Sequence, residues 1–239
     1  MGVSDQIEWV KVDPGRATIG SNNRSILFGG IGPRHMVETK YAFEISKHPV
    51  PLEAATPLIE AKECGLASES EWAVALAQHA ITGSDELEKL SDRCKGNYWG
   101  KALDGRPHWM DDWQFRIAKK WSAGTPKTRL IARESPQPKF VRLMRVEDVS
   151  ECDPDPQILP ASRDTARLLR EELLIILATG ITPSFGWAYF NASRGYIESG
   201  WPGLVLGGII LGLLTGIVWR PKTISYRLGR NCGKVKANN

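Results

Sequence analysis

The chain of 239 residues has only four cysteines, and none of them form a closely spaced pair. They are Cys64, Cys94, Cys152 and Cys232. Cysteine zinc sites and the disulfide frameworks of small secreted domains need regular, close spacing, so we expect neither, and a reducing compartment fits best. The first residues also lack a basic segment followed by an apolar one, so no cleavable secretion signal is expected.

Charge is missing from one long region. Charged residues make up 24% of the chain but nearly vanish between Leu173 and Trp219. Leu173–Phe190 and Trp201–Trp219 contain no charge at all, and each is close to the ~20 residues that cross a bilayer core. The short connector between them, 191–200, predicts an antiparallel hairpin of two transmembrane helices. The first run contains several polar residues and Pro183, so a buried core helix is its alternative.

Basic residues flank this hairpin on both outer sides. Three arginines precede it, and six cations follow it in a tail without acids: Arg163, Arg167, Arg170; Arg220, Lys222, Arg227, Arg230, Lys234, Lys236. The excess of cations on one side predicts a two-pass membrane protein with both termini in the cytoplasm. Because the tail adjoins the membrane, we expect membrane lipid as its partner and no nucleic acid.

Aromatic and glycine residues refine the membrane prediction. The expected interface residues are Trp187, Tyr189, Trp201, Trp219, Arg220 and Lys222. Amphipathic rings and cations favour the headgroup level. The glycines with four-residue spacing are Gly203, Gly207, Gly208, Gly212 and Gly216. They predict close helix packing, within the hairpin or with another membrane-protein subunit, although glycine is common in membrane helices generally.

The pattern of the remaining chain predicts a small α+β domain. We expect a domain over 1–149, a Pro-rich linker and lead-in over 150–167, the hairpin over 168–219 and a basic tail over 220–239. Thr56–Pro57 predicts one helix start. A second helix is predicted at Ser68-Glu69-Ser70-Glu71, which is a capping box in which serine and glutamate each satisfy a free backbone amide.

The order of these motifs resembles the formylglycine-generating enzymes, or sulfatase-modifying-factor domains, which have a C-type-lectin-like fold. The similar segments, which span about residues 8–146, are Ile19-Gly20-Ser21, Pro33-Arg34-His35-Met36-Val37, Phe43 to Val50 with Pro49, Gly65 to Ala73 with Ser68, Glu71 and Trp72, Tyr98-Trp99-Gly100, and Phe140-Val141-Arg142-Leu143. The resemblance implies a lectin-like fold in which Pro33, His35, Pro49, Ser68, Glu71 and Trp72 are structural.

The sequence departs from this family where its chemistry would lie. The family activates oxygen on copper held by a cysteine pair near the end of the domain, and no such pair is found. Copper(I) needs thiolates held close together, and no motif positions Cys64 and Cys94 for this role. We therefore expect no catalytic residue and no cofactor, and interpret the domain as a trimmed, non-catalytic relative.

Three weaker candidates lie in the same domain. His108, Asp111 and Asp112 could bind a divalent ion but are more often a solvated loop. Trp109 and Trp113 are either core residues or an exposed aromatic platform. A candidate basic patch consists of Lys119, Lys120, Lys127, Arg129 and Arg133, which could face acidic lipid or a partner subunit.

Three functions are compatible with these features. The first is a membrane-anchored, non-catalytic binding or structural subunit whose domain docks a partner at the membrane surface. The second is an oxidase of the formylglycine-generating type, or a related metal-dependent enzyme, which requires a metal site that the sequence does not display. The third is a ligand-binding membrane sensor.

Overall fold

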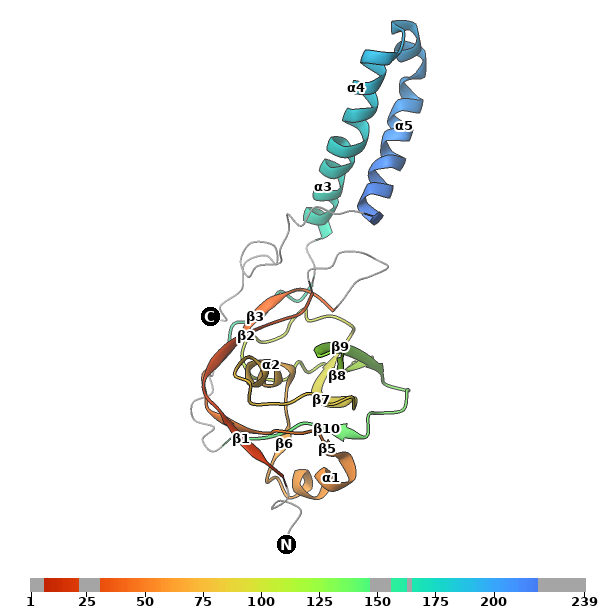
Figure 1. The fold of residues 1–239 in the computed structure, drawn as a ribbon. Helices are drawn as coiled ribbons and strands as arrows, with labels where there is room; N and C mark the ends of the chain where they lie inside the picture. The colour runs from red at the N-terminus through yellow and green to blue at the C-terminus, as the bar shows by residue number, and fades with distance from the viewer. Residues whose placement is uncertain (1–6, 22–30, 147–155, 163–164, 219–239) are drawn as a thin grey trace. The chain divides into compact units, whose positions relative to one another are not determined.

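The computed structural model describes residues 7–21, 31–146, 156–162 and 165–218. It is a mixed α/β structure with two separate parts (Figure 1). We call the described residues up to Ser162 the sheet unit and residues 165–218 the helical unit.

The strands of the sheet unit form three sheets within the described residues. A four-stranded antiparallel sheet has the order β1 (Trp9–Val12), β4 (Phe43–Ser46), β11 (Leu143–Arg145), β6 (Gly65–Leu66). A five-stranded sheet has the order β5 (Val50–Pro51), β10 (Phe140–Val141), β7 (Glu88–Cys94), β8 (Phe115–Ser122), β9 (Thr125–Ala132), in which β10 and β7 are parallel. A two-stranded ribbon consists of β2 (Gly15–Ile19) and β3 (His35–Thr39).

Helix α2 (Glu69–Ala77) begins at the predicted capping box. The Ser68 hydroxyl accepts a hydrogen bond from the Glu71 amide at 3.1 Å, and the Glu71 carboxylate accepts one from the Ser68 amide at 2.7 Å. Helix α1 (Leu52–Glu60) starts earlier than predicted. Thr56 does not cap it, because its hydroxyl donates to the Leu52 carbonyl one turn back, and Pro57 lies inside the helix.

The core of the sheet unit surrounds α2, which lies between the β2–β3 ribbon and the strands β7 to β9 (Figure 1). Trp72, on α2, is 1% exposed and is the largest fully buried side chain. Residues 156–162 also pack here, although their composition indicated a linker. Leu159 is 2% exposed, and its amide donates to the Lys101 carbonyl at 2.9 Å. Proline content alone did not predict this packing, because it depends on a distant loop.

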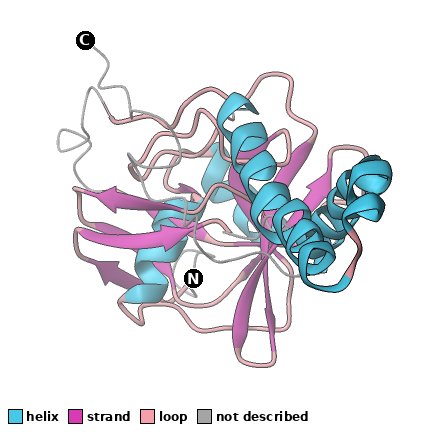
Figure 2. Ribbon diagram, turned by 90° about the horizontal axis from the view of Figure 1, so that it is seen from above, coloured by secondary structure: helices cyan, strands magenta, loops and turns pink. Residues whose placement is uncertain are grey.

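The helical unit is a pair of helical segments that lie side by side (Figure 2). The first segment consists of α3 (Thr165–Ile176), a π-helical turn (Leu177–Ile181) and α4 (Thr182–Asn191), and the second is α5 (Arg194–Val218). Two stretches, Glu172–Asn191 and Arg194–Thr215, are long and apolar enough to cross a membrane. The predicted ten-residue connector is wrong: only Ala192 and Ser193 separate the helices, because residues 194–200 extend α5.

Candidate binding groove

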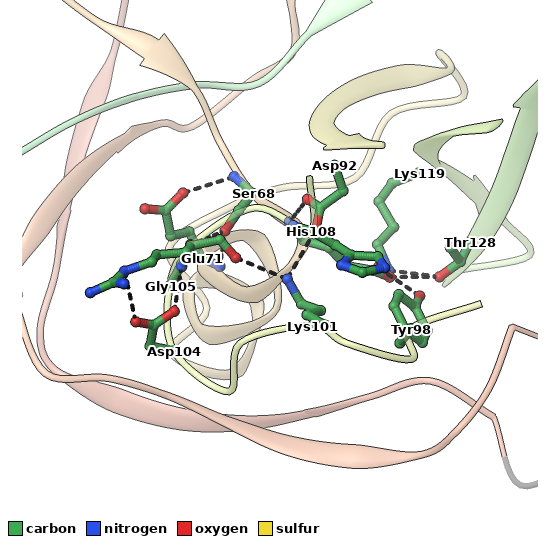
Figure 3. Close-up of polar contacts among 12 residues, drawn as sticks. Ser68, Glu71, Asp92, Tyr98, Lys101, Asp104, Gly105, His108, Lys119 and Thr128 are labelled. Carbon is green, nitrogen blue, oxygen red and sulfur yellow. Dashed lines mark hydrogen bonds and ion pairs between the residues drawn. The ribbon is translucent and has the colours of Figure 1, made fainter. Parts of the chain in front are cut away.

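The first turn of α2 anchors a buried polar cluster (Figure 3). Glu69 is fully buried, and its carboxylate accepts from the Lys119 ammonium at 2.6 Å, the Tyr98 hydroxyl at 2.6 Å and the Thr128 hydroxyl at 3.1 Å. Lys119 also donates to Thr128 at 2.7 Å. A buried charge is costly unless it is paired and hydrogen-bonded. Glu69 meets both conditions through residues from β8, β9 and a loop.

Asp92 on β7 continues the cluster. It accepts from the Glu69 amide at 2.7 Å, the Lys101 ammonium at 3.0 Å and the His108 amide at 2.8 Å. Asp92 and Lys101 have no exposed side-chain surface. The negative charge of Asp92 at the first amide of α2 also complements the positive end of the helix dipole. The contacts of Asp92 therefore fix the start of α2 against β7 and the loop around residues 101–108.

Arg142 forms a third buried ion pair among the described residues of the sheet unit. Its guanidinium donates to both oxygens of Glu88, at 2.6 and 2.8 Å, and Glu88 also accepts from the Trp72 indole at 3.1 Å. The remaining guanidinium protons reach the carbonyls of Ser46, Lys47 and Thr82. This planar arrangement of donors suits arginine and not lysine.

Burial also changes the protonation of three groups. Desolvation lowers the pKa of His35 and of His108 to about 4, so both rings are neutral at pH 7. Each ring has a buried Nε2 atom without a hydrogen-bond partner in the described structure. Desolvation raises the pKa of Glu71 to about 7, against the opposing effect of its hydrogen bonds from Ser68 and Tyr41.

A groove of about 520 Å³ lies above this cluster. Its walls come from β2, β3, α2, β8 and β9, and its lining residues are Arg16, Ala17, Thr18, Ile19, Gly20, Met36, Trp72, Ala73, Leu76, Ala77, Lys119, Pro126 and Thr128. This volume lies in the range of ligand sites, ~300–1,000 Å³. The groove therefore has room for a small molecule or for a few residues of a peptide.

The groove is apolar with two cationic positions. Lys119 and Arg16 line it, and none of its lining residues is acidic. The Lys119 ammonium lies 5.0 Å from the centre of the Trp72 ring, and its exposed fraction is small. Arg16 is largely exposed and pairs with Glu38 at 2.9 Å. The Glu69 carboxylate already accepts three hydrogen bonds, so it is not available as a proton acceptor for a ligand. The groove therefore favours binding of an anionic group over proton transfer.

The groove residues come from segments far apart in the sequence, which is why sequence patterns did not predict the site. The capping box located one wall, since it fixes the α2 face that carries Ala73 and Ala77. Lys119 belonged to the predicted basic patch, but it points away from Lys120. Consecutive side chains alternate across a strand, so β8 places only Lys119 in the groove, where it meets Glu69.

The predicted metal ligands do not converge. His108 is 4% exposed and its amide contacts Asp92, whereas Asp112 pairs with Lys95 and is exposed. The Lys95 contact lowers the pKa of Asp112. Within the residues that the structure describes, no group of three or more His, Cys, Asp or Glu side chains could hold a metal ion.

The two described cysteines lie apart from each other and from the groove. Cys94 is fully buried in the core around Trp72, and burial raises its pKa to about 11. Cys64 is partly buried and packs against the smaller core around Val141. Cys152 and Cys232 lie outside the described residues. The described thiols thus offer no paired ligand set.

The other predicted structural residues occupy different places. His35 is 2% exposed; its Nδ1 atom lies 2.8 Å from the Pro33 carbonyl, and its ring packs edge-on against Tyr98. Pro49 lines a second, smaller hollow of about 380 Å³ near Glu8 and His48. These residues support the sheet unit and do not line the main groove.

Two of the predicted glycines pack inside the helical unit. A Cβ atom on Gly208 would lie 2.7 Å from the Ile181 Cα, and one on Gly212 would lie 2.9 Å from the Ile176 Cα. The same construction at Gly203 or Gly207 meets no atom within 4 Å. The side-chain surroundings of Gly216 are outside the described part.

The helical unit presents apolar side chains outward. Apart from Met36 and Trp109, every large hydrophobic residue that is strongly exposed in the described structure lies between residues 169 and 214. Trp187, Tyr189 and Trp201 are among them. Such a surface is expected for helices in contact with lipid and is rare on soluble domains. Trp219, Arg220 and Lys222 lie outside the described residues.

Comparisons with known proteins identify no relative. No protein-family description, curated protein or solved structure matches the chain.

Proposed function

We propose that the protein is a membrane-anchored, non-catalytic binding subunit whose groove holds an extended acidic segment of a partner protein. The observation that carries the proposal is the groove itself, which has an edge strand on one side and the Lys119 ammonium among its lining residues. The helical unit is the anchor, as a two-pass hairpin with both termini in the cytoplasm.

The shape of the groove supports an extended ligand. Four consecutive β2 residues, Arg16 to Ile19, and the following Gly20 line it, and β2 has only β3 as a partner among the described strands. An unpaired strand edge offers backbone amides and carbonyls to an added strand. Ala73 and Ala77 on α2 leave space beside this edge. An extended peptide can therefore bind through its backbone and place one side chain above α2.

The charges of the groove support an acidic group on that segment. Lys119 and Arg16 are its cations, and none of the lining residues is acidic. Lys119 is held in place by Glu69 and Thr128, so it loses little side-chain freedom when a ligand binds. Glu69 and Thr128 accept two of the three ammonium protons of Lys119, so a carboxylate that enters the groove meets one remaining, preorganised donor.

The proposal extends to the fold family. The resemblance to sulfatase-modifying-factor domains suggests a lectin-like scaffold that has kept its structure and lost its metal site. The α2 capping box and Arg142, which forms the buried pair with Glu88, lie in segments on which that resemblance rests. The oxidase alternative needs a close thiol pair, which Cys64 and Cys94 do not supply.

Site-specific photo-cross-linking in native membranes tests the proposal. A benzophenone amino acid replaces Thr18, an exposed residue of the groove wall, and in a control chain it replaces Glu134, which is exposed and does not line the groove. We expect one discrete protein adduct from position 18 and none from position 134. The Ala77→Phe substitution fills the groove and should reduce the adduct at least ~10-fold.

A matched substitution controls for unspecific effects. Ala61 is exposed at the C-terminal end of α1, as Ala77 is at the end of α2, and it does not line the groove. Ala61→Phe should leave the adduct unchanged. An adduct that survives Ala77→Phe, or that forms equally from position 134, would contradict binding in the groove.

A further inference from the structure

The outer face of strands β7, β8 and β9 has an uncompensated positive charge. We name it the cationic face. Its charged residues are Lys89, Arg93, Arg116, Lys120, Lys127 and Arg129, and Ser91, Ala118 and Ile131 complete it. Its exposed cations are Lys120, Lys127 and Arg129, whereas Arg116 and Ala118 are buried. The acids of these strands, Glu88 and Asp92, are fully buried on the opposite side, where they bind Arg142 and Lys101. The face itself therefore contains no acid.

Like charges lie directly opposite each other on this face. The strand register pairs Arg93 with Arg116 and Lys120 with Lys127. Such pairs destabilise a sheet. No carboxylate in the described structure forms an ion pair with any of the six cations. Burial and the neighbouring Arg116 and Arg93 lower the pKa of Lys89, as expected where positive charge is not neutralised.

Two tryptophans border the cationic face. The Arg93 guanidinium lies 4.0 Å from the centre of the Trp109 ring, and Trp109 is 55% exposed. Trp113 has Arg93, Arg116 and Arg133 within 5.5 Å of its ring centre. Amphipathic rings next to arginines are typical of surfaces that meet the headgroup region of a bilayer.

We propose that the cationic face docks the sheet unit on an anionic lipid surface. Charge complementarity supports this occupant, because Lys120, Lys127 and Arg129 are exposed together on neighbouring strands. The chain also limits the alternatives, since only nine residues, 163–171, lie between Ser162, the last described residue of the sheet unit, and Glu172, where the first candidate span begins. These residues can bridge at most ~36 Å, so the sheet unit stays close to any membrane that the hairpin crosses.

Hydrogen exchange of the full chain in lipid nanodiscs tests this proposal. The readout is the amide exchange of β9 residues 125–132, because β9 is an edge strand in the described sheet. We expect at least ~10-fold slower exchange in discs with about one-third phosphatidylserine than in purely zwitterionic discs, and loss of the difference in 0.5 M salt. Equal exchange in both kinds of disc would overturn the proposal.

Two variants, both with the basic tail unchanged, test whether the protection of β9 comes from the cationic face. Lys120→Gln/Lys127→Gln removes two exposed, directly opposed cations and should abolish most of the protection. Lys11→Gln/Lys139→Gln removes two exposed cations that do not belong to this face, and this variant should keep the protection of β9. Equal loss in both variants would show a general charge effect and overturn the assignment.

Two further additions to zwitterionic discs exclude other anions. We expect neither 1 mM pyrophosphate nor a single-stranded RNA oligonucleotide to protect β9 as strongly as anionic lipid does. Stronger protection by either one would assign the face to a soluble phosphate compound or to nucleic acid, and would overturn lipid docking. This outcome is independent of the groove, because Thr18 and Ala77 do not belong to the cationic face.

Discussion

Arg93 on β7 and Arg116 on β8 lie directly opposite each other, and both guanidinium groups contact the ring of Trp113, at 5.3 and 5.5 Å from its centre. The electron-rich ring face attracts cations. It therefore offsets part of the repulsion between two arginines that have no acidic partner in the described structure. Trp113 holds together a pair of charges that would otherwise weaken the sheet.

Trp113→Leu should lower the stability of the sheet unit by about 1–2 kcal/mol, because three cation–π contacts are lost. Added salt should recover part of this loss by screening the arginines. Trp109→Leu is the control, since Trp109 has one such contact and is half exposed. Thermal unfolding followed by tryptophan fluorescence measures both. An equal cost for the two variants would contradict the role of Trp113.

Arg142→Lys should cost about 3–5 kcal/mol, because it leaves Glu88 with a poorer buried partner and frees up to three carbonyls. Arg145→Lys is the matched control: Arg145 pairs with Glu44 but is 41% exposed, so its change should cost less than about 1 kcal/mol. Urea unfolding in mild detergent gives both values. Similar losses in the free energy of unfolding would contradict a larger contribution from the buried pair than from the exposed one.

Gly208→Val should disrupt the helical unit, whereas Gly207→Val should not. The added Cβ atom at Gly208 meets the Ile181 backbone at 2.7 Å, but the one at Gly207 meets nothing within 4 Å. Amide hydrogen exchange of residues 176–181 in mild detergent reports the helix pairing, because this stretch packs against Gly208 and Gly212. We expect at least ~5-fold faster exchange for Gly208→Val only. Unchanged exchange would contradict the observed packing.

Stability should depend on pH through three buried groups. Between pH 6.5 and about 4, His35 and His108 bind protons in the unfolded chain but not in the folded one, so both lower stability as pH falls. Glu71 acts oppositely: its pKa rises from 4.5 to about 7 on folding, so its contribution is full below pH 4.5 and is lost as pH rises towards 7.

These three groups leave a net uptake of about one proton on unfolding at pH 5–6, or about 1.4 kcal/mol per pH unit. His108→Asn should remove this slope. His79→Asn is the control, because His79 is exposed and asparagine tolerates its positive φ of 58°. Urea unfolding at several pH values gives the slope, and an unchanged slope in His108→Asn would contradict a neutral, buried His108.

Local patterns predicted the parts of the fold that depend on neighbouring residues. The Ser68–Glu71 capping box and the two apolar runs are examples, since a helix start and a span depend on residues within a few positions. The predicted start of α1 at Thr56 was wrong. There the hydroxyl bonds back to Leu52, and the same residue types that cap a helix can also lie inside one.

Long-range assembly accounts for what the sequence did not predict. Glu69, Lys119 and Thr128 come from three elements, and only the pairing of β8 with β9 brings the last two together. Leu159 joins the core from a segment whose prolines indicated a linker. The basic patch was predicted as one surface, but strand alternation places Lys119 in the groove and Lys120, Lys127 and Arg129 on the cationic face. Arg133 belongs to neither.

We propose that a two-pass hairpin holds the sheet unit at a membrane, and epitope accessibility tests this most directly. Tags at the two ends of the full chain are exposed to protease in sealed membranes, before and after detergent, and a separate sample is extracted with alkaline carbonate. We expect the chain to stay in the membrane fraction and both tags to lie on the cytoplasmic side. Release by carbonate, or tags on opposite sides, would contradict it.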